Sequence, residues 1–217
     1  MIRILENFNT LEHILLSIPG VIIAVVIHEF VKSLVAHKMG DTGIAAQGRL
    51  TLNPLKHMDA LGSIFMAIWG FGWANPVKLA PGTYKERKKA MLLIFALPFI
   101  ASIVVGGIFA VLAGIWWFHA VFINPYSTAF HNSVNWALIL ASQLNIGFAI
   151  LNLIPIYPLD GTIFLSGVSP TAGAKVAQSE RILQVILALG IIFGIVHFLL
   201  GPLVSQIFRL FFQLAFI

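Results

Sequence analysis

The chain of 217 residues contains no cysteine, and only 10% of its residues are charged. Without cysteine there are no disulfide bonds and no thiolate ligands, so a metal ion would have to be bound by His, Asp, Glu or backbone oxygen. Soluble domains carry about 25% charged residues, which excludes an ordinary soluble domain. The hydrophobic content of 59% and the mean hydropathy of +0.96 instead predict a polytopic membrane protein.

The formal net charge of the chain is +5 at pH 7. Basic and aromatic residues are not interleaved as they are in a nucleic-acid-binding groove, so we expect no nucleic acid partner. The positive charge fits loops that face anionic lipid, and the lipid bilayer is the expected surrounding. The first ten residues lack the basic start and the compact apolar core of a cleavable signal peptide.

Long apolar runs predict where the chain crosses the membrane. We expect crossings at about 14–36, 91–118, 136–156 and 182–200, with 203–217 crossing back or lying along the interface. The apolar run from Leu61 to Trp73 is too short to cross and predicts a re-entrant or tilted element. Turn formers punctuate segment 39–59, and the alternation in Arg49-Leu50-Thr51-Leu52 predicts a strand or hairpin there.

The distribution of Lys and Arg predicts an orientation. Both are concentrated in segments 38–89 and 175–181, whereas the loop 119–132 contains neither. Basic loops are retained in the cytoplasm. The basic segments are therefore expected on the cytoplasmic side, and the loop 119–132, which lacks Lys and Arg, on the outside.

One motif stands out in the first apolar run, His28-Glu29-Phe30-Val31-Lys32. It has the form of the zinc-binding H-E-x-x-H helix, in which residues i and i+4 share one face, two imidazoles bind one zinc ion and the glutamate activates its water. Lys32 stands where the second histidine should be. Of the eight acidic residues, only Glu29 and Asp160 lie in or at the end of strongly apolar segments, where burial of a carboxylate predicts a function.

Further motifs follow in order along the chain: Gly40-Asp41, the run 48–59, the run 72–77, and N-x-x-P-x-x-x-L-D-G from Asn152 to Gly161. Together with His28-Glu29 they resemble the site-2 proteases, zinc-dependent intramembrane metalloproteases of peptidase family M50, in the compact form without a PDZ insertion. The resemblance implies an all-α polytopic membrane protein with about six transmembrane helices. A small β-hairpin or re-entrant element is expected at its cytoplasmic side, in a single domain over residues 1–217.

Carried over residue by residue, the resemblance makes His28 and Asp160 zinc ligands and Glu29 the general base, with the second motif ligand replaced by Lys32. The segment 49–53 could pair with an extended peptide by strand addition. The candidate substrate-binding residues are Arg49, Leu50, Thr51, Leu52, Asn53 and Asn152.

Two departures from the family pattern fall around the same site. The Gly-Pro-x-x-Asn patch reads Leu97-Pro98-Phe99-Ile100-Ala101, and Ala101 has no side chain that can donate a hydrogen bond. The glycine and arginine that usually follow L-D-G are Thr162 and Ile163. Clustered losses of this kind predict impaired or absent catalysis.

Electrostatics suggests why a lysine replaces the ligand. Without a metal, Glu29 and Asp160 would be two like charges in a low-dielectric site. Lys32 follows Glu29 by three helical positions, so its ammonium could lie between both carboxylates, roughly where zinc would be. In the alternative interpretation Lys32 reaches the membrane interface and Glu29 is protonated. The expected cofactor is zinc if the site is functional, and none if Lys32 takes its place.

Three functions remain open from the sequence. The chain could be an inactive homologue that binds a transmembrane substrate or partner, an active intramembrane metalloendopeptidase, or a path for ions or solutes through the polar pocket. We favour the first, in the plasma membrane of a prokaryote, with the site toward the cytoplasm.

Overall fold

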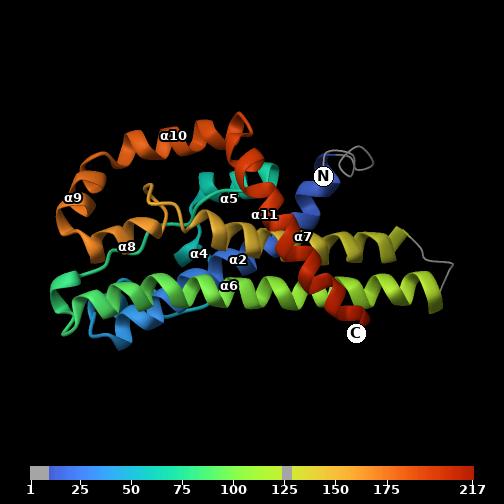
Figure 1. The fold of residues 1–217 in the computed structure, drawn as a ribbon, viewed down its shortest axis with the longest axis horizontal. Helices are drawn as coiled ribbons and strands as arrows, with labels where there is room; N and C mark the ends of the chain where they lie inside the picture. Colours follow the sequence, from blue (N-terminus) through green and yellow to red (C-terminus); the bar gives the residue numbers. More distant parts are fainter. Residues whose placement is uncertain (1–9, 124–128) are drawn as a thin grey trace.

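The computed structural model describes residues 10–123 and 129–217, and within them the chain is helical (Figure 1). Residues 1–9 and 124–128 lie outside this description, so a single domain over the whole chain stays a prediction. The α-helices are α2 Thr10–Lys38, α3 Gly43–Ala46, α4 Pro54–His57, α5 Ala60–Trp69, α6 Arg87–Phe118, α7 Ala129–Leu151, α8 Gly161–Val168, α9 Pro170–Gln178, α10 Glu180–Ile192 and α11 Ile195–Gln213.

Among the described residues, four helical segments are long and apolar enough to cross a membrane. They are Leu11–Lys38, Arg87–Phe122, Ala129–Leu151 and Ile195–Phe216. The expected all-α membrane protein is confirmed, whereas the expected count of about six crossings is not. With 10 and 13 residues, α5 and α10 rise only about 15 and 20 Å, less than the roughly 30 Å of a hydrocarbon core.

The C-terminal helices divide at a different glycine from the one expected. A boundary at Gly201-Pro202 was expected, but Pro202 lies inside α11 and the chain breaks at Gly194 instead. Gly194 has a φ of 74°, a left-handed conformation that glycine adopts readily and that commonly ends a helix. The single crossing predicted over 182–200 is therefore wrong, and α11 is the candidate span.

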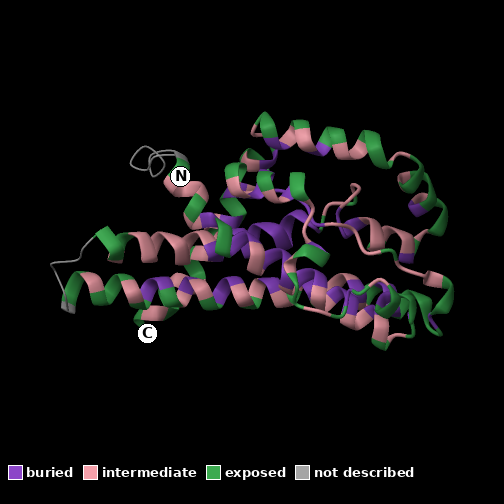
Figure 2. Cartoon of the chain, turned by 180° about the vertical axis from the view of Figure 1, so that it is seen from behind, coloured by how far each residue is buried: buried purple, intermediate pink, exposed green. Residues whose placement is uncertain are grey.

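The three long helices α2, α6 and α7 lie side by side, and α11 crosses them obliquely (Figure 1). Small residues allow close approach at the helix contacts, as is common in membranes. A Cβ atom on Gly20 of α2 would lie 2.8 Å from the Cα of Ala141 in α7. Buried residues concentrate along the middle of these helices (Figure 2). His28, Glu29, Lys32 and Asp160 are all buried.

No strand or hairpin forms over 49–53 in the described part of the chain, so this prediction is not confirmed. Arg49 donates side-chain hydrogen bonds to the backbone oxygens of Asn75 (3.1 Å) and Pro76 (3.2 Å). Asn53 caps α4 by accepting from the backbone N–H of Leu55. Asn53 thus satisfies a backbone group of its own turn and Arg49 satisfies backbone groups of a distant segment, in place of a hairpin ladder.

The short apolar run folds back on itself. α5 ends at Gly70, which has a φ of 78°, and the chain returns beside the helix. A Cβ atom on Gly72 would lie 2.0 Å from the backbone oxygen of Gly62. The two glycines permit a backbone contact that no larger residue allows, which fits the short element expected from the sequence.

Gly40-Asp41 stabilises the turn after α2. The buried Asp41 carboxylate accepts hydrogen bonds from the backbone N–H groups of Gly43 (3.1 Å) and Ala80 (2.8 Å) and from the hydroxyl of Tyr84 (3.2 Å). Burial and the nearby carboxylate raise the pKa of Tyr84. This motif therefore has a structural role.

Candidate functional site: a buried lysine between two carboxylates

The structure brings four of the predicted site residues together. α2 carries His28, Glu29 and Lys32, and Asp160 directly precedes α8. His28 Nε2 lies 2.9 Å from Asp160 Oδ2, and Lys32 Nζ lies 2.6 Å from Asp160 Oδ1. Lys32 Nζ also donates a hydrogen bond to Glu29 Oε1. Each of the four residues is at most 3% exposed.

Asp160 is held by the irregular segment that follows α7. The Asn152 side chain accepts a hydrogen bond from the backbone N–H of Asp160 (3.1 Å) and donates one to the backbone oxygen of Phe148 (2.9 Å). A Cβ atom on Gly161 would lie 2.4 Å from the carbonyl carbon of Ile154. The segment is therefore folded tightly on itself, and the Asn152 side chain holds the backbone of Asp160. A role of Asn152 in substrate binding stays a prediction.

Among the described residues, His28 contacts Asp160, Ser102 and Phe148, of which only Asp160 was indicated by the sequence. Its Nδ1 lies 3.0 Å from the hydroxyl of Ser102 in α6, and its ring meets the edge of Phe148 at 5.0 Å between centroids. A neutral imidazole satisfies both polar contacts if Nε2–H donates to Asp160 and Nδ1 accepts from Ser102. Ser102 directly follows Ala101 in the altered patch, and this was the only sequence signal for it.

In the cluster one ammonium faces two carboxylates, so the acidic groups outnumber the basic one. Burying such groups is very unfavourable unless they are paired. The second oxygen of Glu29, Oε2, is buried and has no hydrogen-bond partner among the described residues. Lys32 is thus the positive group that makes burial of both carboxylates tolerable.

Three side chains of the cluster could hold a metal ion, and Lys32 competes for two of them. His28, Glu29 and Asp160 offer ligand atoms within 4.8 Å of one another. An ammonium has donors and no lone pair, so it cannot serve as a ligand. Lys32 instead donates to Glu29 and Asp160, using oxygens that a metal would bind. The predicted position of the ammonium between the two carboxylates is what the geometry shows.

The candidate substrate-binding segment 49–53 lies outside the cluster but is linked to it. Arg49 bonds to the backbone of Asn75 and Pro76. Pro76 lines a small cavity of about 100 Å³ together with Lys32, Tyr157 and Asp160. The side chains of Leu50 and Leu52 are 36% and 58% exposed. Thr51 contacts the ring of His57 through its backbone oxygen, at 2.6 Å.

Two curated proteins are similar to the chain. A Bacillus subtilis (strain 168) protein named "Putative zinc metalloprotease YwhC" is 33% identical over 164 residues, 73% of this chain and 72% of that protein. "Putative zinc metalloprotease Rip2" of Mycolicibacterium smegmatis is 26% identical over 152 residues, 68% of this chain and 54% of that protein. The chain belongs to the site-2 protease-like family of zinc metalloproteases. No family model and no solved structure gives a significant match.

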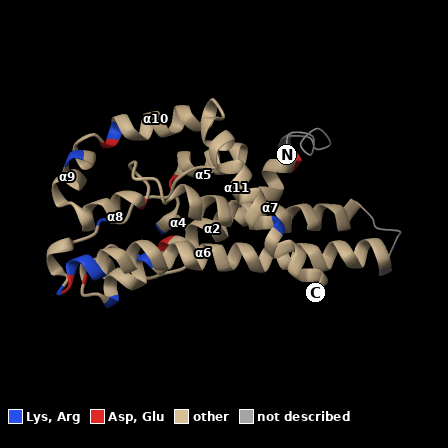
Figure 3. Cartoon of the chain, viewed as in Figure 1, with Lys and Arg blue, Asp and Glu red and all other residues tan. Residues whose placement is uncertain are grey.

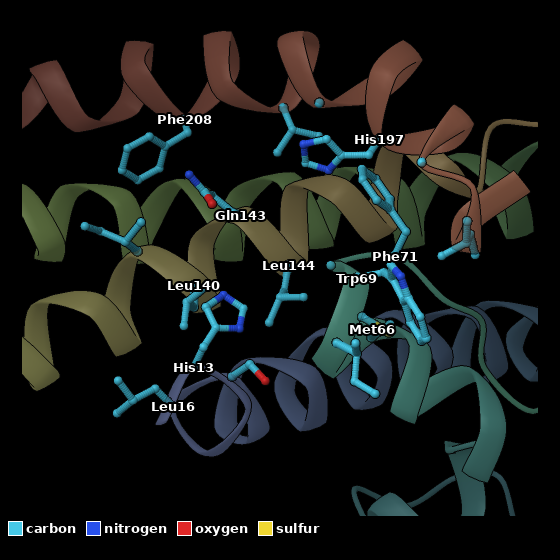
Figure 4. Close-up of a pocket in the computed structure, with 18 of the residues that line it drawn as sticks. His13, Leu16, Met66, Trp69, Phe71, Leu140, Gln143, Leu144, His197 and Phe208 are labelled. Atoms are coloured by element: carbon cyan, nitrogen blue, oxygen red, sulfur yellow. The ribbon is translucent and has the colours of Figure 1, made fainter. Parts of the chain in front are cut away.

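This site-2 protease-like protein also has a larger cavity, away from the charged cluster. It has a volume of about 600 Å³ and lies among α2, α5, α7 and the C-terminal helices. Figure 4 shows that His13, Gln143 and His197 reach it from three different helices, α2, α7 and α11. Its lining is otherwise mostly apolar, and none of His28, Glu29, Lys32 or Asp160 belongs to it. No motif or apolar pattern in the sequence predicted this cavity.

Proposed function

We propose that this protein is a catalytically inactive member of the site-2 protease-like family that binds transmembrane segments of other proteins without cleaving them. The observation that carries the proposal is the ammonium of Lys32, which donates to both Glu29 and Asp160. Zinc proteases depend on a water molecule activated by the metal. A lysine in hydrogen-bond contact with both carboxylates removes the conditions for binding that metal.

In this proposal Lys32 takes over the structural part of the metal's role. The lysine is contributed by α2, and Asp160 belongs to the segment that joins α7 to α8. The ion pair therefore links two parts of the chain that are 128 positions apart. The fold of a protease is retained, while its chemistry is lost.

The segment from Leu50 to Leu52 supports the binding of a partner. Within the described residues, the backbone–backbone hydrogen bonds between segments leave these three residues unpaired. Apart from the Thr51 oxygen, which contacts His57, the backbone groups of this segment are available to pair with a peptide by strand addition, and the exposed Leu50 and Leu52 side chains can contact its apolar residues. Arg49 fixes the base of the segment against Asn75 and Pro76.

We further propose that the protein resides in the plasma membrane of a prokaryote with this site toward the cytoplasm. Charged residues gather at one end of the bundle, around the start of α6 and at α9 (Figure 3). The positive-inside rule favours that end as cytoplasmic. Both similar proteins come from bacteria.

The metal content of the purified protein and of its Lys32→His variant tests loss of the metal site. We expect zinc far below one ion per chain in the unmodified protein and a rise toward one in Lys32→His, because the substitution removes the ammonium and supplies the missing imidazole. Elemental analysis after dialysis against zinc gives the ratio. In a second variant, Lys32→His with His28→Ala, the gained zinc should be lost again.

Cleavage and binding are measured with a labelled transmembrane segment in detergent. We expect the unmodified protein to bind it without cleaving it, and Leu50→Asp with Leu52→Asp to weaken binding at unchanged thermal stability. Cleavage by the unmodified chain, abolished by Glu29→Gln, would overturn the proposal. If Lys32→His binds zinc but does not cleave, Ala101→Asn should be added, because the altered patch at 97–101 is then a second cause of the missing activity.

A further inference from the structure

Lys32, Asp160 and Glu29 have the arrangement needed for an amide bond between two side chains. The amine nitrogen of Lys32 lies 2.6 Å from Asp160 Oδ1, and a second carboxylate, Glu29, is hydrogen-bonded to the same nitrogen. The three side chains are between 2% and 4% exposed. A nucleophile, an acyl group and a proton carrier are therefore enclosed together.

We propose that Lys32 and Asp160 condense into an intramolecular isopeptide bond, with Glu29 as the catalytic residue that transfers protons. The proposal concerns the same contact as the proposed function but does not depend on partner binding. The ion pair is the starting state of this reaction, and the amide is its product.

The reaction balances without a cofactor or an oxidant. The Lys32 ammonium gives one proton to Glu29, and the free amine attacks Cγ of Asp160, so that a C–N bond forms. The nitrogen then passes a second proton to one of the two former carboxylate oxygens, and Glu29 delivers its proton to the same oxygen. The C–O bond to that oxygen breaks and it leaves as water, so the nitrogen keeps the single hydrogen of an amide. An ammonium and a carboxylate have then become an amide and one water molecule, and Glu29 is regenerated.

Three features of the site favour this reaction. Holding amine and carboxyl in contact replaces a bimolecular encounter by an intramolecular step. For well-oriented groups, the effective concentration of one reactant at the other reaches about 10⁵–10⁸ M. Exclusion of water makes the separated charges unfavourable relative to a neutral amide. His28 Nε2, 2.9 Å from Asp160 Oδ2, can donate to the oxygen on which negative charge develops during attack.

A small cavity beside Lys32 and Asp160 can take up the water that is released. The cavity of about 100 Å³ is lined by both Lys32 and Asp160. This exceeds the roughly 30 Å³ that one water molecule takes up in the liquid. The reverse reaction would require water to return to a site with little exposure.

The intact mass of the purified protein tests the proposal. We expect the unmodified chain to be lighter than its sequence by one water molecule, and Lys32→Arg, which keeps the positive charge, to have its full mass. Glu29→Gln keeps the size of the side chain but removes the proton carrier, and it should also have its full mass. An unmodified chain at full mass, after incubation in the folded state, overturns the proposal.

Cleavage at methionine locates the bond. Cyanogen bromide cuts after Met39 and Met91 and after the methionines between them, which separates residues 2–39 from residues 92–217. The unmodified chain should yield these two fragments as one linked species, whereas Lys32→Arg should yield them apart. A lost water without linked fragments also overturns the proposal. Either failure leaves the zinc and binding experiments, and hence the proposed function, unaffected.

Discussion

Replacing Lys32 by alanine is expected to lower the free energy of unfolding by about 3–5 kcal/mol, because it leaves the buried carboxylates of Glu29 and Asp160 without their cation. For a chain of this size, a loss of that magnitude corresponds to a fall in melting temperature of roughly 6–20 °C. Thermal unfolding in detergent, followed by intrinsic fluorescence, measures the shift.

A second lysine in the chain provides a matched control. Lys89 pairs with Glu86 at the same i,i+3 spacing as Lys32 with Glu29, but at 3.6 Å and with side chains 62% and 68% exposed. Exposed pairs contribute about 0–1 kcal/mol, so Lys89→Ala should leave the melting temperature nearly unchanged. Equal shifts for the two alanine variants would contradict the assigned importance of burial.

A further variant distinguishes the loss of charge pairing in Lys32→Ala from the loss of side-chain volume. Adding Glu29→Gln and Asp160→Asn to Lys32→Ala removes the uncompensated negative charges while nearly keeping the shape of the two side chains. Because the amides carry no charge, this triple variant should be more stable than Lys32→Ala alone. If it is less stable, packing of the lysine stem and not charge explains the effect.

Gly161→Ala is expected to destabilise the protein by about 3 kcal/mol and to displace Asp160. The added Cβ would lie 2.4 Å from both the carbonyl carbon and the oxygen of Ile154, and these are backbone atoms that cannot turn aside. Overpacking of this kind costs about 1–3 kcal/mol when the surroundings can adjust only by a backbone shift. Thermal unfolding measures the stability, and the intact mass reports whether Lys32 and Asp160 still meet.

Gly82→Ala is the control for this substitution. Nothing lies within 4 Å of a Cβ at Gly82, and its φ is not in the left-handed range. A glycine replaced at such a position changes stability by less than about 1 kcal/mol, mostly through the unfolded chain. Similar losses for Gly161→Ala and Gly82→Ala would mean that the contact with Ile154 does not determine the position of Asp160.

The part of the site carried by one helix could be predicted from the sequence. Helical periodicity places Glu29 and Lys32 on neighbouring positions of one face, and the structure pairs them. That Asp160 lies beside them could not be derived from spacing, and it came from the resemblance to the site-2 proteases. Ser102 and Phe148 were missed because a uniformly apolar run does not reveal which side of a helix faces His28.

The predictions of element boundaries that the structure does not confirm have a common cause. At Gly194 and at Gly201-Pro202 the sequence offers similar helix-ending residues, so local preference cannot choose between them. A Cβ at Gly194 would meet nothing within 4 Å, whereas Gly201 packs against the ring of His197 one turn earlier in the same helix. Likewise, the alternation at 49–52 predicted a strand, but the long side chain of Arg49 satisfied backbone oxygens elsewhere.

The ion pair of Lys32 has an evolutionary consequence. The codons for lysine and histidine differ at more than one nucleotide, and the single-step intermediates encode asparagine or glutamine. Either amide would leave Glu29 and Asp160 enclosed without a cation, the condition that is most destabilising for this cluster. A change of Lys32 to histidine would therefore have to pass through a destabilised single-step variant, so the ion pair itself opposes the gain of a second histidine at this site.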